Sequence, residues 1–173
     1  MKGRNTKIAV FLSLFFFTLL FLWYSGEAQA ELIDRSVAFV NDTVITLSDL
    51  KEMYEKTRKV RPDISMKEVL ATMINRVLIL NEAKRLKFEA KTDDELFNDY
   101  VELKVRAFIR IKEEETADFY AKNIQDFKGA PYEAVRDKIE EYLTEKEVNR
   151  LLKEQIAELR ARAYVKIVME ELR

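Results

Sequence analysis

The sequence offers few side chains for catalysis or metal binding. Its 173 residues include no histidine and no cysteine. Histidine is the commonest general base and metal ligand, and cysteine thiolate is a common nucleophile and zinc ligand. Ser-His-Asp and Cys-His catalytic sites are therefore excluded, and so are zinc sites built on these residues. Disulfide bonds are excluded as well.

Carboxylate pairs remain possible as groups that transfer protons. The chain has 31 acidic residues, and a suitably placed pair is enough for general acid-base chemistry. They are spread along amphipathic segments, a pattern typical of charged surface that faces water. The sequence therefore predicts a protein that is not an enzyme, with no catalytic residue, no metal site and no cofactor.

Adaptable apolar contacts are the other chemistry that the side chains provide. Methionine and aromatic residues can adjust to many partners when they stay exposed. Packing in the core is the alternative for each of them. Phe119 is the strongest candidate, because it lies off the helical face formed by Ala117, Tyr120 and Ile124. The candidate residues for such adaptable contacts are Met53, Tyr54, Phe97, Tyr100, Phe108, Phe119 and Phe127.

The first thirty residues are typical of an export signal. Three basic residues precede the uncharged stretch from Ile8 to Trp23, and Ala28-Gln29-Ala30 matches the small-x-small pattern of a signal peptidase site. We expect cleavage after Ala30 and a periplasmic protein. The alternative is an uncleaved membrane anchor, although 16 apolar residues are fewer than the roughly 20 that span a bilayer.

Composition favours one helical domain after this segment. Cleavage leaves 143 residues, with 27 basic and 30 acidic side chains. This balance predicts no nucleic-acid partner. Only three glycines and two prolines occur in the whole chain, which favours helices over a multi-stranded sandwich.

Periodicity places the elements that must position the candidate side chains. Two β-branched runs flanking Asn41-Asp42 predict a hairpin over 36–46, and an alternating run predicts a strand over 164–168. Capping boxes and apolar spacing predict helices between them. Their expected bounds are 47–57, 65–86, 92–110, 113–128 and 131–161. The fold class is mainly α, with a small antiparallel sheet formed by the hairpin and the carboxyl-terminal strand.

Three segments carry a resemblance to a known family. Ile33–Leu50 reads IDRSVAFVNDTVITLSDL, Met73–Leu86 reads MINRVLILNEAKRL, and Leu159–Ile167 reads LRARAYVKI. In this order they resemble the amino-terminal hairpin and helix, the next core helix, and the final helix and strand of SurA-type periplasmic chaperones. The resemblance implies a helical module whose last strand returns to the hairpin. It also implies an ATP-independent holdase for unfolded outer-membrane and secreted proteins.

One departure from the family limits what it implies. SurA-type proteins usually carry parvulin prolyl isomerase domains before the final helix, whereas 111–130 has room for only one helix here. The parvulin site also uses histidines, which this chain lacks. We therefore expect no prolyl isomerase activity.

A dedicated interaction subunit is the alternative function. Such a protein would bind one specific partner or a second copy of itself. Tyr142 with Leu143 and Leu151 with Leu152 widen the apolar stripe of the long helix, which would favour a homodimer. Contact with a membrane is expected only if the first thirty residues are not cut.

Overall fold

The structure, a computed structural model, describes residues 34–168. All of these residues belong to one compact unit. The predicted export signal and its cleavage site after Ala30 lie outside the described residues.

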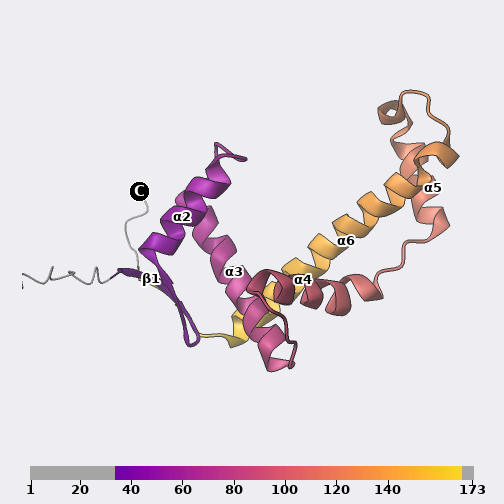
Figure 1. Ribbon diagram of the computed structural model, residues 1–173. Helices are drawn as coiled ribbons and strands as arrows, with labels where there is room; N and C mark the ends of the chain where they lie inside the picture. The colour runs from indigo at the N-terminus through magenta and orange to yellow at the C-terminus, as the bar shows by residue number, and fades with distance from the viewer. Residues whose placement is uncertain (1–33, 169–173) are drawn as a thin grey trace, which may run out of the picture. The chain divides into compact units, whose positions relative to one another are not determined.

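Helices form most of this unit, and a small sheet lies at one end (Figure 1). The strands are β1 (Ser36–Val40), β2 (Thr43–Thr46) and β3 (Val165–Ile167). The α-helices are α2 (Leu47–Arg58), α3 (Met66–Arg85), α4 (Asp93–Lys104), α5 (Glu113–Lys122) and α6 (Tyr132–Arg162). Two 3-10 helices, η1 (Arg106–Phe108) and η2 (Ile124–Phe127), follow α4 and α5.

The sheet confirms the predicted fold class. Its strand order is β2-β1-β3, and both pairings are antiparallel. The hairpin therefore receives the carboxyl-terminal strand at its open side, although the two are separated by more than a hundred residues. The observed strand is β3, which is shorter than the 164–168 expected from the sequence.

The turn of the hairpin holds this strand in place. Asn41 adopts a positive φ of 51°, a conformation that asparagine tolerates better than most residues. Its backbone N–H donates to the Tyr164 carbonyl over 2.8 Å, and its side-chain oxygen accepts from the Tyr164 N–H over 2.9 Å. The Asn41-Asp42 pair thus closes the hairpin and anchors the chain end.

A bulge explains how the apolar residues of β1 are buried. The register shifts between Ser36 and Ala38, so that Val37 is an extra residue opposite β2. Val37 and Ala38 are both fully buried, while Val44 on β2 is 44% exposed. A regular strand would send successive side chains to opposite faces. The burial of successive residues on β1 therefore does not extend to the neighbouring strand.

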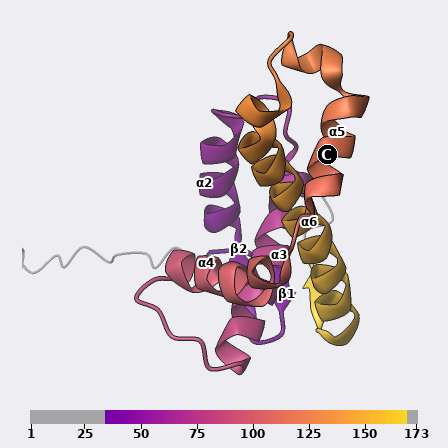
Figure 2. The same ribbon diagram turned by 90° about the vertical axis from the view of Figure 1, so that its right-hand side faces the viewer.

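The main core lies between the sheet, α2, α3, α4 and the last turns of α6. Its fully buried members include Leu50, Ile74, Ile79 and Tyr100. α3 contributes most because it is central, with neighbours on both sides (Figures 1 and 2). This explains why its apolar face is wide.

Side-chain caps fix the starts of α2 and α3. Thr46 caps α2, and Asp49 reaches back to the cap to complete a capping box. Ser65 and Glu68 form the same arrangement at α3, with the Ser65 Oγ accepting from the Glu68 N–H over 3.2 Å. The Thr92 side chain caps α4, but there Glu95 bonds to the N–H of Lys91 instead.

The α3 cap gives a first testable prediction. Ser65→Ala is expected to lower the free energy of unfolding by about 1 kcal/mol, because it removes the acceptor for a helix N–H. Ser65→Gly is expected to cost only a few tenths of a kcal/mol. Urea denaturation of both variants measures the difference. Equal losses would contradict the role of Ser65 as an N-cap residue.

The helix predicted over 92–110 is correct up to Lys104 and wrong beyond it. α4 ends at Lys104, and Val105, with φ −119° and ψ −65°, leads into η1. The tighter turn lets Val105 and Ile109 pack on Val148 of α6 in a second, small core. The free energy gained by burying these two β-branched side chains is larger than that of one more turn of α-helix.

The helix predicted over 113–128 is also too long. α5 ends at Lys122, where the Asn123 side chain donates to the Phe119 carbonyl over 2.7 Å. After η2, Lys128 and Gly129 have positive φ values of 50° and 85°. They reverse the chain so that α6 returns antiparallel to α5. Pro131 precedes α6 as its N-cap.

α6 is the element on which the candidate site is built. Its 31 residues correspond to a length of about 47 Å. The buried residues of this helix are Ile139, Val148 and Leu159. They mark its contacts with α5, with the second core and with the main core, in that order. Between these contacts the helix is covered on one side only.

Candidate functional site

A large open groove follows the middle of α6. Its volume is about 1170 Å³. One wall is the chain from Phe108 to Ile111, and Glu115 of α5 also lines the groove. The lining residues on α6 are Tyr142, Leu143, Glu145, Lys146, Glu147, Asn149, Arg150, Leu151, Lys153 and Glu154.

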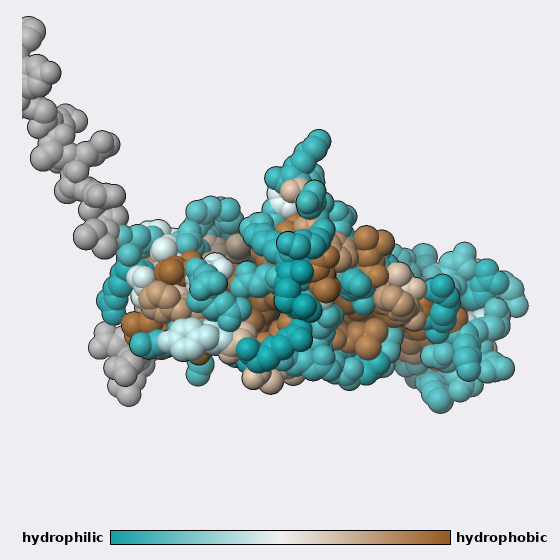
Figure 3. Space-filling view, turned by 90° about the horizontal axis from the view of Figure 1, so that it is seen from below, coloured by the Kyte–Doolittle hydropathy of each residue, from teal (hydrophilic) through white to brown (hydrophobic). Residues whose placement is uncertain are grey.

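Aromatic and aliphatic side chains reach the surface of this groove. Phe108 is 74% exposed and Tyr142 is 53% exposed. Phe108 points outward because η1 turns its neighbours Val105 and Ile109 into the second core. Figure 3 shows apolar surface on the lower face of the molecule, between its middle and the end where α5 lies, with charged side chains around it. The exposure of Phe108 in this surface is therefore a consequence of the 3-10 geometry of η1.

The groove is lined by equal numbers of acidic and basic side chains. Glu115, Glu145, Glu147 and Glu154 are the four acidic residues, and Arg110, Lys146, Arg150 and Lys153 are the four basic ones. Arg150 pairs with Glu147 and Glu154 along α6. A groove of this kind has no net charge that would select for acidic or basic partners.

One ion-pair network connects η1 to α6. The Arg106 guanidinium lies 2.8 Å from Glu102 and 2.6 Å from Glu145. Glu145, its strongest partner, and Glu102 raise the pKa of Arg106 above its ordinary value. The contact links residues 39 positions apart and joins η1 to the part of α6 that lines the groove.

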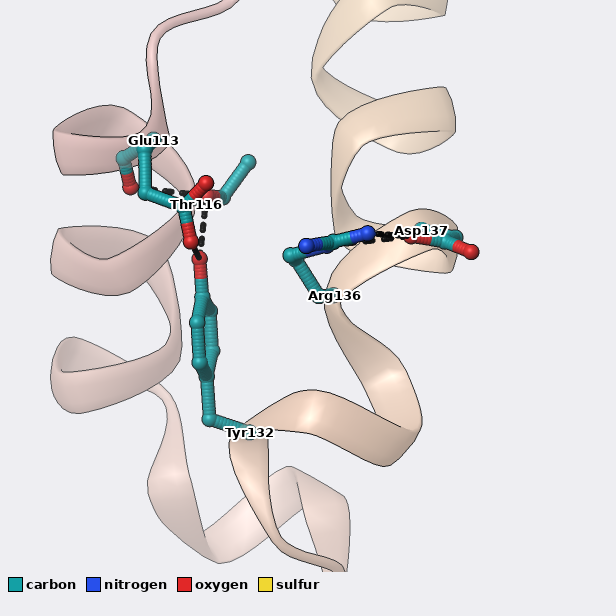
Figure 4. Close-up of polar contacts among 5 residues, drawn as sticks. All are labelled: Glu113, Thr116, Tyr132, Arg136 and Asp137. Carbon is teal, nitrogen blue, oxygen red and sulfur yellow. Dashed lines mark hydrogen bonds and ion pairs between the residues drawn. The ribbon is translucent and has the colours of Figure 1, made fainter.

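Polar contacts fasten α5 to the start of α6. The Tyr132 hydroxyl lies 2.7 Å from the Thr116 hydroxyl and donates to the Glu113 carboxylate over 3.0 Å (Figure 4). Thr116 is buried and donates to the Glu113 carbonyl. The Tyr120 hydroxyl donates to the Ala130 carbonyl over 2.7 Å. The α5–α6 turn is therefore held by side chains on both helices.

An aromatic cluster fills the space between these helices. The ring of Phe119 lies 5.2 Å from that of Tyr142 and 6.4 Å from that of Phe127, measured between centroids. Tyr120 joins the cluster through Phe127 and Tyr132. Tyr142 belongs both to this cluster and to the groove, so packing orients its ring while part of it stays exposed.

The structure separates the seven predicted client-binding residues. Phe108 is the only one of the seven that lines the groove. Phe119 and Phe127 lie half-buried in the aromatic cluster beside it. Met53 lines a smaller pocket of about 310 Å³ between β2, α2 and α3. Tyr54 is half-buried below Arg58.

Two further candidates lie at or in the main core. Phe97 is half-buried below the Arg76 guanidinium, 5.0 Å from the ring centroid. Tyr100 is fully buried, which corrects its selection as a surface contact. Its position on α4 faces α3 and α6, so binding a client at Tyr100 would require the core to open.

Sequence reasoning did not select Tyr142 as a candidate for adaptable contacts, although its ring is exposed in the groove. It noted the residue only as part of a widened apolar stripe that could favour self-association. The signal was present, because an aromatic residue beside the apolar seam of a long helix often has one exposed side. The exposed Leu103, at 60%, and Ile124, at 54%, were missed as well.

A buried carboxylate fastens the last turn of α6 to α3. The Glu82 side chain is 9% exposed and accepts two hydrogen bonds of 2.7 Å from Arg85. Arg162 on α6 approaches it to 3.1 Å. The hydrogen bonds from Arg85 lower the pKa of Glu82 most, and the charge of Arg162 lowers it further. The pKa therefore stays below its ordinary value, although burial raises it. Glu82 therefore stabilises the fold in its ionised form.

This arrangement predicts a pH dependence. Because folding lowers the pKa of Glu82, its contribution is fully present above the ordinary value of 4.5 and is lost as the pH falls through the folded value. Glu82→Gln is expected to lower the free energy of unfolding at pH 7 by about 1–3 kcal/mol. It is also expected to flatten the loss of stability between about pH 5 and 3.

Urea denaturation at several pH values measures both effects. Glu158→Gln, a change at an exposed position on α6, is the control and is expected to keep the wild-type pH profile. An unchanged acid limb in Glu82→Gln would contradict this role for Glu82.

Metal-binding clusters and membrane-spanning helices are both absent from the described part of the chain. Residues 34–168 contain no group of three or more acidic residues placed to hold a metal ion. Within the same range, no helix combines the length and the apolar character that crossing a membrane requires.

Comparison with known families identifies the chain. A model described as the SurA-like N-terminal domain matches residues 1–109. The chain belongs to this family. No curated protein matched the chain.

Membership in the SurA-like N-terminal domain family implies a chaperone-like or protein-interaction role. The match ends at Ile109, which packs in the second core. It therefore includes Phe108 in one wall of the groove, while α5 and α6 lie beyond it. The groove combines a wall within the matched region with a helix outside it.

Proposed function

We propose that this protein is an ATP-independent periplasmic holdase that binds unfolded or partly folded outer-membrane and secreted proteins. The observation that carries the proposal is the open groove along α6, with Phe108 and Tyr142 exposed in it. Family membership supports a role in binding polypeptides.

The groove suits clients that differ in sequence. Aromatic and aliphatic side chains can be covered by many apolar segments, since the hydrophobic effect is not directional. Equal numbers of acidic and basic residues impose no charge requirement on the client. An open groove also lets an extended chain enter and leave without a large conformational change. These properties favour weak binding of many clients.

The proposed activity uses binding alone. The sequence carries no ATP-binding motif, and the histidines of a parvulin site are absent from it. Between η1 and α6 the described chain consists of α5, η2 and short connections. We therefore propose that the protein has no prolyl isomerase activity. Turnover of a prolyl peptide well above its uncatalysed rate would contradict this.

Export and cleavage are part of the proposal. Mass measurement of the protein after expression of the full-length chain tests them. An amino terminus at Glu31 in the periplasmic fraction is expected. An intact amino terminus in the membrane fraction would instead support a tethered protein that meets clients at the inner membrane.

Suppression of aggregation is the direct test of the holdase. The chain starting at Glu31 is mixed with an unfolded outer-membrane protein that has been diluted from urea, and light scattering is followed. We expect suppression that increases with chaperone concentration. No suppression at several-fold molar excess would reject the holdase function.

The second candidate is a subunit that binds one partner or itself. The exposed aromatic rings of Phe108 and Tyr142 favour it, because two large rings on one groove also suit a single shape-matched surface. Light scattering of the isolated protein measures self-association, and a pull-down from periplasmic extract identifies partners. One stoichiometric partner bound with nanomolar affinity would favour this candidate over the holdase.

A further inference from the structure

The turn between α2 and α3 carries the most exposed large apolar residue of the described chain. Val60 is 84% exposed. It lies between Lys59 and Arg61, and Arg58 precedes them, so three cationic side chains surround one aliphatic side chain. A single exposed valine is ordinary. The three cations on the same turn make this surface different, because it is apolar at its tip and positively charged around it.

Backbone hydrogen bonds hold this turn in a defined conformation. The N–H groups of Val60 and Arg61 both donate to the Thr57 carbonyl, over 3.0 and 2.8 Å. The Ile64 N–H donates to the Arg61 carbonyl over 3.2 Å. Ile64 itself is buried in the main core at 5% exposure. Val60 is therefore presented outward by an anchored turn.

The cations of the turn are only weakly engaged within the protein. Arg61 approaches Glu68 at 3.7 Å, and both side chains are 57% exposed. Such an exposed ion pair contributes little to stability, and the carboxylate of Glu68 mainly accepts a hydrogen bond from the Ser65 hydroxyl. Arg58 lies over the Tyr54 ring at 5.9 Å, a contact that does not neutralise its charge. Asp63 is the one acidic residue between Arg58 and Ser65.

The turn is separate from the groove. It lies at the end of the α2–α3 pair away from the sheet (Figures 1 and 2), and none of its residues lines the groove. A partner bound at the turn would therefore leave the groove free.

We propose that this turn docks the protein on the surface of an anionic phospholipid bilayer. Arg58, Lys59 and Arg61 pair with phosphate groups, and Val60 enters the boundary between headgroups and acyl chains. Basic side chains near an anionic surface attract it additively, and a small apolar insertion strengthens the attachment. Long cationic side chains can reach the headgroups while the apolar tip points inward. Binding at this site is peripheral and does not require an uncleaved export signal.

Vesicle binding tests the proposal on the chain starting at Glu31. Sedimentation with vesicles of phosphatidylcholine alone is compared with vesicles that contain phosphatidylglycerol. We expect binding to the anionic vesicles only, and a loss of binding at high salt. Lys59→Gln with Arg61→Gln is expected to weaken it about 30-fold. The matched control, Lys104→Gln with Lys138→Gln, removes two exposed charges elsewhere and is expected to bind as the wild type does.

A fluorescent probe tests the insertion of the tip. The natural sequence has one tryptophan, Trp23, which lies before Glu31. Val60→Trp therefore places a single tryptophan in the tested chain. Its emission is expected to shift to shorter wavelength with anionic vesicles and to stay unchanged with soluble heparin.

Three results would overturn the proposal. They are equal binding to both kinds of vesicle, equal weakening by the control pair, and a probe emission that does not respond to anionic vesicles. Binding to heparin as tight as to vesicles, without a shift, would show a general polyanion site instead. Because no client is present in these experiments, their outcome does not depend on the proposed holdase activity.

Discussion

Tyr100→Ala is expected to lower the free energy of unfolding by about 3–5 kcal/mol. The Tyr100 ring is fully buried and lies 5.8 Å from the Phe88 ring, between centroids. Its hydroxyl accepts a hydrogen bond from the Gln155 amide of α6. Removing the ring leaves a cavity where α3, α4 and α6 meet, and a side-chain amide on α6 loses its partner. The free energy of unfolding of most single domains is only about 5–15 kcal/mol in total.

Urea denaturation and thermal melting measure this loss. For a domain of this size we expect the melting temperature to fall by roughly 10–15 °C. Phe108→Ala is the control, because its ring is 74% exposed, and its cost is expected to stay within about 0.5 kcal/mol. Similar losses in both variants would contradict the assignment of Tyr100 to the core and Phe108 to the surface.

A conservative change separates the ring from its hydroxyl. Tyr100→Phe keeps the packing against Phe88 and removes only the acceptor for Gln155. Its cost is expected to be about 1–2 kcal/mol. Burial also raises the pKa of Tyr100, so the hydroxyl stays neutral through the ordinary range and this cost is expected to be constant between about pH 6 and 9.

Local patterns were sufficient to predict the sheet and the fold class. Asn41-Asp42 between two β-branched runs specified the hairpin, and the alternating run after Ala163 specified the third strand. Their pairing followed because each had no other strand available. Capping boxes at Thr46 and Ser65 are short-range signals as well, and both are present in the structure.

Helix ends at the groove depended on contacts that no local pattern records. Val105 and Ile109 leave the α-helix because Val148, some forty residues later, offers them a buried site. The apolar spacing of 92–110 is compatible with a continuous helix, so periodicity alone predicts one. Since η1 is what exposes Phe108, the groove could not be located before that tertiary contact was known.

The same limitation explains the errors among the candidate site residues. Tyr100 and Tyr142 both lie on apolar stripes of helices, yet the first is fully buried and the second is 53% exposed. α4 is covered by α3 and α6 at Tyr100, whereas α6 extends beyond the main core at Tyr142. Spacing defines the face of a helix on which a residue lies, but not whether another element covers that face.

Removing both exposed rings of the groove is expected to abolish most client binding. Phe108→Ser with Tyr142→Ser should weaken binding of an unfolded outer-membrane protein by about 100-fold. Each ring contributes roughly a tenfold effect if about 1.5 kcal/mol of apolar burial is lost. The two rings lie on opposite walls of one groove, so a client that spans it contacts both. Fluorescence anisotropy of a labelled client measures the dissociation constant, and aggregation assays measure the consequence.

Two controls test whether the loss of binding comes from the groove: the stability of the double variant and a substitution at another exposed position. Phe108 is exposed and Tyr142 partly so, and the double variant is expected to keep its helical circular dichroism and most of its melting temperature. Val60→Ser removes an exposed apolar side chain that does not line the groove, and its client affinity is expected to match that of the wild type. If the double variant binds the client as the wild type does, the groove is not the client site. If Val60→Ser weakens binding equally, clients use exposed apolar surface in general. If the double variant loses one specific partner and keeps its holdase activity, the groove serves a dedicated interaction.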